Sequence, residues 1–410
     1  MAAGTGPALA ALTGAVMLSQ FFRSCLAVIA PELQHDLGLN AAGFGALSSA
    51  FFGAFALMQL PCGVAFDRYG VGRPTAVLTA VGIAGGALFA LAPNGGTALV
   101  AQAALGVACA PAFMGLLHYA SEHLDESRFH RVTAVTNGLG ILGALVAAAP
   151  LGWAAAAFGW RAPILCATAG LAVVCIAVAR TLHDRGHAEA RAESPAAVLR
   201  SCAGLLRIRP FWTLIPLCMA LAAGTSFRSA WGGPYFASVF GLETVQRGIA
   251  ISLVTLTAFG SAFVLPVLMR RWSLKTTVQR WSGASLLLCL ALAAAPGLWL
   301  PLDLVLLAAM CTVGMLHPMV MSHGREMIGP ALRGRGLGLL NSFVFLGSAV
   351  VSAAYGWIAE AGQRRGWSAA ATFGWIFVAA ALWLLMGLVA YRRSPVARGR
   401  PTPEDDAAGV

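Results

Sequence analysis

Long runs of apolar residues constrain this 410-residue chain more than any other feature of its sequence. A helix that crosses the hydrocarbon core of a bilayer needs about 20 mostly apolar residues. Twelve runs of this kind can be read from the sequence, near 7–30, 41–66, 74–92, 97–120, 132–157, 162–182, 210–235, 246–269, 277–295, 298–322, 336–361 and 369–391. We therefore predict an all-α membrane protein with twelve transmembrane helices.

The composition agrees with this prediction and argues against a soluble protein. The chain is 59% hydrophobic and 10% charged, whereas soluble domains are about 45–50% apolar and about 25% charged. The nine cysteines are scattered singly, so we expect neither a disulfide framework nor a zinc site. The first apolar run lacks a basic leader and is too long for a signal peptide, so we expect it to remain as a membrane span.

The basic residues predict the orientation of the chain in the membrane. If the N-terminus is cytoplasmic, 21 of the 27 basic residues lie in inner connections and only 4 in outer ones. Cytoplasmic loops carry an excess of lysine and arginine, so both termini are expected in the cytoplasm, with the protein in a bacterial inner membrane. The net charge of +11 then reflects orientation and predicts no nucleic-acid partner.

Short motifs recur at an offset of 203–205 residues, which indicates an internal repeat. The Phe-Arg-Ser of residues 22–24 recurs at 227–229, and Asn137 recurs as Asn341. Parallel repeats about an axis along the membrane normal are typical of transporters. We expect two six-helix bundles related by pseudo-two-fold symmetry. The expected parts are an N-terminal bundle (1–182), a cytoplasmic linker (183–209) with a short amphipathic helix at 195–206, a C-terminal bundle (210–391) and a disordered tail (392–410).

The connection after the second run, GVAFDRYGVGRP at 63–74, carries a recognisable motif. It resembles the loop 2–3 signature of the major facilitator superfamily, in which the matching positions are Gly63, Asp67, Arg68, Gly70 and Arg73. The resemblance implies a twelve-helix secondary transporter, and it implies that this cluster latches the two halves in the outward-open state. The counterpart at 267–275 keeps basic residues but has no acid.

Two arginines are the only charges that the predicted spans place inside the bilayer. Arg23 and Arg228 occupy equivalent positions in the two halves, and no acidic residue lies at comparable depth. A charge at this depth normally faces a cavity and has a function. A guanidinium can bind a carboxylate or phosphate with two parallel hydrogen bonds, so we expect an anionic solute between them. The alternative is a structural arginine that bonds backbone carbonyls or reaches the interface.

Helical spacing adds residues to this expected pocket. Gln20 lies one turn before Arg23, and Thr225, Trp231 and Tyr235 share a helix face with Arg228. Asn137 and Asn341 are expected to line the pocket as well. The arginine pair resembles that of the organophosphate:phosphate antiporters, and Arg23 alone that of the anion:cation symporters. We expect uptake of a small organic anion, a carboxylate or phosphate ester, by proton symport or anion exchange, with a monomeric protein and no cofactor.

Histidine and methionine residues leave other interpretations open. His118 and His317 are candidates for proton coupling because histidine titrates near neutral pH, although packed histidines are more common. Residues Met315, His317, Met319 and Met321 have the spacing of Cu(I) ligands and resemble copper importers of the superfamily. A receptor that binds solute without moving it is a further alternative. No hydrolase, metalloprotease or nucleotide-binding motif is present, so we expect no enzyme.

Overall fold

The computed structural model describes residues 5–182, 203–328 and 332–395, and within these ranges the chain is helical and contains no strand. Ten of the described helical segments are long and apolar enough to cross a membrane. The chain is therefore a multi-pass helical membrane protein. Two predicted spans are not among the ten: 210–235 is broken into short helices, and 277–295 lies in α17 (Leu274–Ala294), which also carries Lys275 and Arg280.

The first part of the chain forms helices joined by short connections. Asparagine or aspartate begins three of them, because the side-chain oxygens of Asn40, Asn94 and Asp125 accept the backbone N–H three residues further on, at 2.8, 3.0 and 2.9 Å. The helices are α1 (Thr5–Ser24), α2 (Leu26–Leu37), α3 (Ala41–Tyr69), α4 (Gly72–Ala90), α5 (Gly95–Cys109), α6 (Pro111–His123), α7 (Glu126–Val146), α8 (Ala149–Phe158) and α9 (Arg161–Thr181).

The second part has more interruptions. Pro216, Pro266 and Pro318 lie in the first turn of α12, α16 and α19, where the missing N–H does no harm. The elements are α11 (Arg209–Trp212), α12 (Ile215–Ala220), α13 (Ala222–Ser226), the π-helical turn η1 (Phe227–Trp231), α14 (Gly232–Phe240), α15 (Thr244–Gly260), the 3₁₀ turn η2 (Ser261–Phe263), α16 (Leu265–Met269), α17, α18 (Leu300–Cys311), the 3₁₀ turn η3 (Thr312–Leu316), α19 (His317–Met327), α20 (Arg333–Arg364) and α21 (Ala369–Arg392).

Four interruptions occur at matching places in the two parts. The first predicted span breaks at Cys25 and the fourth at Ala110, while the seventh contains η1 and the tenth contains η3. Arg23 lies beside the first of these breaks, and Arg228 lies within η1. Isolated π-turns inside α-helices occur frequently at functional sites. The arginines predicted to bind an anion are therefore both next to irregular backbone.

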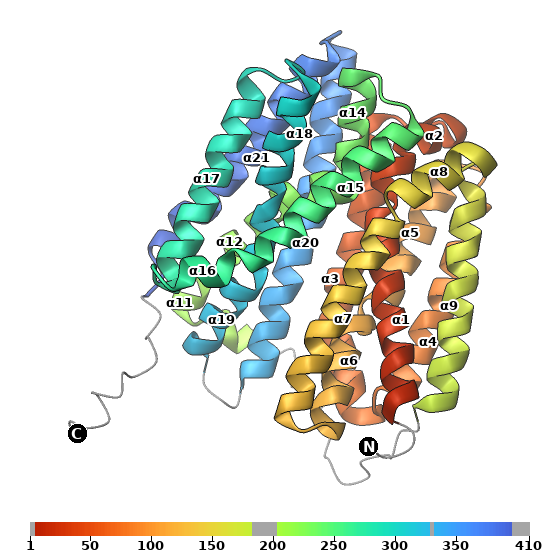
Figure 1. The fold of residues 1–410 in the computed structure, drawn as a ribbon, viewed down its shortest axis with the longest axis vertical. Coiled ribbons are helices and arrows are strands. Elements are labelled where there is room, and N and C mark those ends of the chain that lie inside the picture. The colour runs from red at the N-terminus through yellow and green to blue at the C-terminus, as the bar shows by residue number, and fades with distance from the viewer. Residues whose placement is uncertain (1–4, 183–202, 329–331, 396–410) are drawn as a thin grey trace.

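Helices α1–α9 and α11–α21 form two groups that lie side by side in Figure 1, red to yellow-green and green to blue. We call them the first and second helix groups. Helix α1 begins at the lower end of this view, and α21 ends on the left of the second group, beside α11. We call this side the termini end, and the opposite end the far end. Along the boundary, α3 packs against α20. Most of the predicted linker, 183–202, and the tail 396–410 lie outside the described residues.

Glycines allow the two groups to touch toward the far end. A Cβ atom on Gly233 would lie 1.4 Å from the carbonyl oxygen of Ala27, and one on Gly45 would lie 2.7 Å from that of Ser352. Ser48 donates a hydrogen bond of 3.0 Å to Ser352 in the same region. Small residues let helix backbones approach closely, so the helices of the two groups are in direct contact here.

Candidate functional site

A cavity of about 510 Å³ lies between the two helix groups. It extends from Arg23 near the middle of the first span to the beginning of α20 at the termini end. Both groups contribute to its wall, and its lining includes Val16, Ser19, Gln20, Arg23, Phe55, Gln59, Cys109, Ala110, Met114, Asn137, Gly140, His317, Met321, Gly334, Leu337, Gly338, Asn341 and Phe345. None of the described lining residues is acidic.

Arg23 packs against two neighbouring aromatic rings, Phe55 and Phe345, whose centroids are 4.2 Å apart. The carbon of its guanidinium is 4.9 Å from the centroid of Phe55, on α3, and 4.9 Å from that of Phe345, on α20. Such cation–π contacts are worth about 0.5–2 kcal/mol each. Arg23 has no ion pair within the described ranges, and its buried Nε has no hydrogen-bond partner. The rings fix the position of the charge and leave it without a counter-ion.

Side-chain amides surround this charge, and several of their atoms are unpaired. Asn341 Nδ2 donates to Gln59 Oε1 at 2.8 Å, which links α20 to α3 across the boundary. Gln59 Nε2 and Gln20 Oε1 are buried without a partner. Buried polar groups in proteins are nearly always hydrogen-bonded. These amides can therefore accept and donate hydrogen bonds to a polar ligand or water.

Four of the predicted pocket residues line this cavity, namely Arg23, Gln20, Asn137 and Asn341. The structure adds Gln59, which the sequence reasoning missed. The sequence does not single out Gln59, because it is one glutamine in an apolar run and the sequence does not show which residue it contacts. The pairing with Asn341, 282 positions away, identifies it.

Arg228 is not among the lining residues of this cavity. Its guanidinium carbon is 5.2 Å from the ring centroid of Phe259, and its buried Nη1 has no hydrogen-bond partner. It is close enough to Arg23 for electrostatic repulsion between the two charges. Within the described part of the chain Arg228 forms no ion pair, so it is a second cation without a carboxylate partner there.

Thr225, Trp231 and Tyr235 also lie away from the cavity lining. The Thr225 hydroxyl donates to the carbonyl of Leu221 at 3.1 Å. Trp231 is buried against Phe44, with ring centroids 5.4 Å apart. The Tyr235 hydroxyl donates to Asp303, a buried carboxylate that also accepts from the Gly297 N–H. These contacts are structural, and a part for the three residues in substrate binding stays a prediction.

The two candidate histidines have different surroundings. His317 lines the cavity, and its buried Nε2 has no hydrogen-bond partner. His118 lies on α6 and pairs with Glu122 at 3.2 Å, one turn closer to the termini end. Of the copper-candidate residues, Met321 shares the cavity wall with His317, whereas Met319 is buried in the core and Met315 lies outside the lining. A proton-coupling role fits His317 better than His118.

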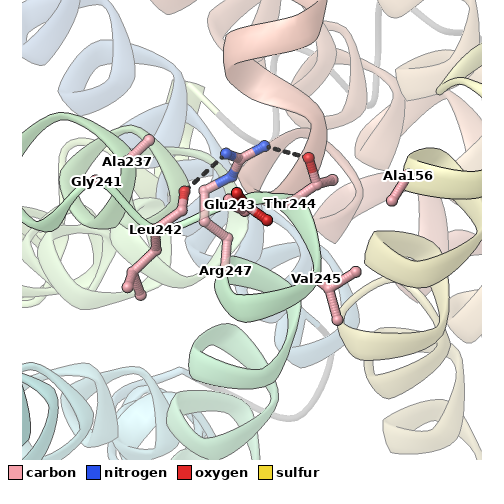
Figure 2. A pocket seen from close by; sticks show the side chains of 8 residues that line it. All are labelled: Ala156, Ala237, Gly241, Leu242, Glu243, Thr244, Val245 and Arg247. Carbon is pink, nitrogen blue, oxygen red and sulfur yellow. Dashed lines mark hydrogen bonds between the residues drawn. The ribbon is translucent and has the colours of Figure 1, made fainter.

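The far end is closed by a hydrogen-bonded arginine that joins the two groups. Arg247, on α15, is 4% exposed and donates to the Val28 carbonyl of α2 at 3.2 and 3.3 Å. It also pairs with Glu32 of α2 and donates to Leu242 and Thr244 of its own group. Figure 2 shows this guanidinium at a far-end pocket of about 520 Å³. The central cavity is therefore separated from the far end.

The signature segment lies at the end of α3. Gly70 has a φ of +75°, which ends the helix in a conformation that favours glycine. Arg68 stacks over Tyr69 at 5.2 Å, and Asp67 and Arg68 are exposed. Gly63 and Arg73 lie on α3 and α4 on either side of this turn. A latch function of the cluster stays a prediction.

A cavity between two helix groups, closed at one end and reaching toward the other, is the architecture of a membrane transporter. The family model described as Major Facilitator Superfamily matches residues 12–351, and the chain belongs to this family. It is a transport protein and not an enzyme.

Two curated relatives come from Bacillus subtilis (strain 168). The chain is 28% identical over 166 residues to its probable galactarate/D-glucarate transporter, which covers 38% of this chain and 35% of the relative. It is 28% identical over 155 residues to its hexuronate transporter, which covers 38% of this chain and 37% of that relative. The matches thus span little more than a third of the length of these relatives.

Solved structures agree in fold over nearly the whole chain. The nucleoside transporter NupG has a TM-score of 0.75 at 15% identity, covering 95% of this chain and 100% of that one. A bacterial homologue of the human lysosomal transporter Spinster, in an inward-facing and unoccupied conformation, has a TM-score of 0.76 at 14% identity, covering 98% and 100%. These similarities confirm the predicted major facilitator fold.

Proposed function

We propose that this chain is a monomeric twelve-span transporter of a bacterial inner membrane, with two six-helix bundles related by pseudo-two-fold symmetry and both termini in the cytoplasm. It takes up a small organic anion by alternating access, through proton symport or anion exchange. The termini end is then the cytoplasmic end, and the conformation described above is open toward the cytoplasm. The 63–74 cluster latches the opposite, outward-open conformation.

One observation carries the proposal: Arg23 presents a fixed charge to the cavity without an acidic partner. Arg23 is held by Phe55 and Phe345, and no described lining residue is acidic. Taking a charge out of water is costly unless it is paired. A carboxylate or phosphate that enters the cavity supplies the missing partner and forms charge-assisted hydrogen bonds. Arg228, which does not line the cavity, adds to the positive electrostatic potential of the site.

The amides narrow the class of anion to one that also carries hydroxyl groups. Gln20, Gln59 and Asn341 offer both donors and acceptors within the cavity, as hydroxyl groups require. The names of the two Bacillus relatives, a galactarate/D-glucarate and a hexuronate transporter, point to the same chemistry. A sugar acid is the substrate that fits both the charge and the amides.

A ligand screen tests this proposal. Purified protein is heated with galactarate, D-glucarate, a hexuronate, a hexose phosphate or glucose, because a ligand that binds only the folded protein stabilises it by about 2.7 kcal/mol at 100 times its Kd. We expect the sugar acids to raise the unfolding temperature and glucose to leave it unchanged. Equal stabilisation by glucose contradicts the proposal. Uptake into liposomes then separates a transporter from a receptor that only binds.

His317 is the residue we expect to couple transport to protons. It lines the same cavity as Arg23, so the positive charge of Arg23 opposes a second positive charge on the imidazole. An arriving anion offsets that repulsion, so substrate and proton favour each other. We expect His317→Gln to abolish uptake driven by a pH gradient while substrate exchange between the two sides persists. His118→Gln is the control and should retain both, and gradient-driven uptake by His317→Gln contradicts the assignment.

A further inference from the structure

A second cavity lies away from the proposed substrate site, in the second helix group. It has a volume of about 780 Å³ and is enclosed by α15, η2, α17, α18 and η3. Its walls include Val264 and Ala284, and both of these side chains are exposed. The neighbouring Phe263 is 83% exposed. In a membrane protein such surfaces face lipid, so this cavity opens sideways to the bilayer.

The break between α15 and α16 forms the cavity. The 3₁₀ turn Ser261–Phe263 and the proline at 266 interrupt this span, and the Ser261 hydroxyl donates to the Ala258 carbonyl at 2.6 Å. On the opposite wall, Trp281 Nε1 donates to Thr312 Oγ1 at 2.9 Å, which ties α17 to η3. The space is therefore bounded by fixed contacts on both sides.

The end of the cavity nearest the termini end is basic. Arg280 lines it, and its guanidinium carbon is 4.3 Å from the ring centroid of Trp272, another lining residue. Arg270 and Arg271 precede Trp272 and are exposed. None of the described lining residues is acidic. Tryptophan and arginine at the end of a span are placed at the level of lipid headgroups.

We propose that this cavity is a binding site for an anionic phospholipid of the inner leaflet. The Arg280 guanidinium, held in place by Trp272, binds the phosphate with paired hydrogen bonds. An acyl chain fills the apolar space between Val264, Ala284 and Leu288. Basic pockets between membrane helices on the cytoplasmic side bind anionic headgroups in this way. The site needs an apolar tail as well as a phosphate, so inorganic phosphate alone is a poor ligand.

Native mass spectrometry of the full-length protein in detergent tests the site. The protein is titrated with phosphatidylglycerol, with phosphatidylcholine and with phosphatidylglycerol in the presence of excess inorganic phosphate. We expect retention of phosphatidylglycerol, weaker retention of phosphatidylcholine and no competition by phosphate. Arg280→Gln should weaken phosphatidylglycerol binding about tenfold, the effect of one lost charge-assisted contact. Ala284→Trp should weaken it by filling the acyl-chain space.

The matched control is Arg365→Gln. Arg365 also stacks on a tryptophan, Trp367, at 5.3 Å, but it directly follows the last residue of α20, at the opposite end of that helix from its start at the termini end. Thermal unfolding in the absence of lipid checks that each variant is folded. Equal phosphatidylglycerol retention by the Arg280→Gln, Ala284→Trp and Arg365→Gln variants overturns the proposal. Displacement by inorganic phosphate also overturns it, because the site then recognises a free anion.

Discussion

Replacing Arg23 by glutamine should lower kcat/KM for sugar-acid uptake by at least about 100-fold. Hydrogen bonds to charged groups contribute about 1.5–3 kcal/mol each, and a carboxylate bound by both arms of a guanidinium forms two of them. A loss of about 3 kcal/mol corresponds to more than 100-fold. Glutamine keeps a polar group beside Phe55 and Phe345 but removes the charge. The measurement is uptake of labelled sugar acid into liposomes.

Two further variants make this result specific. Arg23→Lys keeps the charge but loses the planar guanidinium that can form two parallel hydrogen bonds. We therefore expect an uptake activity between that of the unmodified protein and that of Arg23→Gln. Arg228→Gln tests the second half of the predicted clamp and should also reduce uptake, because it removes positive potential from beside the cavity. If Arg23→Gln transports at the normal rate while remaining folded, the anion-binding role of this cavity is wrong.

The second large effect is expected at the far end, where Glu32→Gln should open the closed contact. The substitution leaves the Arg247 charge buried without its partner, since Arg247 is 4% exposed. Removing one partner of a fully buried pair costs about 3–5 kcal/mol. The Glu32 side chain is 32% exposed, so we expect about 2 kcal/mol, or roughly a 30-fold shift of the conformational equilibrium toward the outward-open state.

Spin labels at positions 156 and 237, in a cysteine-free background, measure this shift. Ala156 on α8 and Ala237 on α14 lie in different helix groups and both line the far-end pocket. We expect a longer distance population in Glu32→Gln. The control is Glu360→Gln, because Glu360 pairs with Arg364 at 3.0 Å within α20 and its loss leaves the contact between groups intact. An unchanged distance distribution in Glu32→Gln means that this pair does not hold the far end.

The helical architecture was accessible from the sequence because each span must cover the same bilayer thickness. The apolar runs locate most helices to within a few residues. Contacts between the two helix groups could not be predicted from the sequence in this way. The bonds of Arg247 to Val28 and Glu32 join residues more than 200 positions apart, and no periodicity relates them.

The residues predicted near Arg23 line the central cavity and those predicted near Arg228 do not, for a geometric reason. The stripe from Thr225 to Tyr235 assumes 3.6 residues per turn throughout. The π-turn at Phe227–Trp231 accommodates an additional residue. The side chains after this turn are therefore rotated about the helix axis relative to the side chains before it. Tyr235 therefore lies in the core beside Asp303 and not on the cavity wall. A π-turn has no clear sequence signature, so the spacing alone could not reveal this rotation.

The contact of Arg23 with Phe55 and Phe345 has a consequence for the transporter when no substrate is bound. One ring belongs to α3 and the other to α20, so any motion that separates these helices breaks the contact between the rings and removes one of them from Arg23. In the proposed cycle, an unloaded protein must break that contact unaided. A bound carboxylate neutralises the cation and weakens its attraction to the rings. In this proposal the charge of Arg23 binds the substrate and also slows the conformational change when no substrate is bound. The empty transporter therefore changes conformation more slowly than the loaded one.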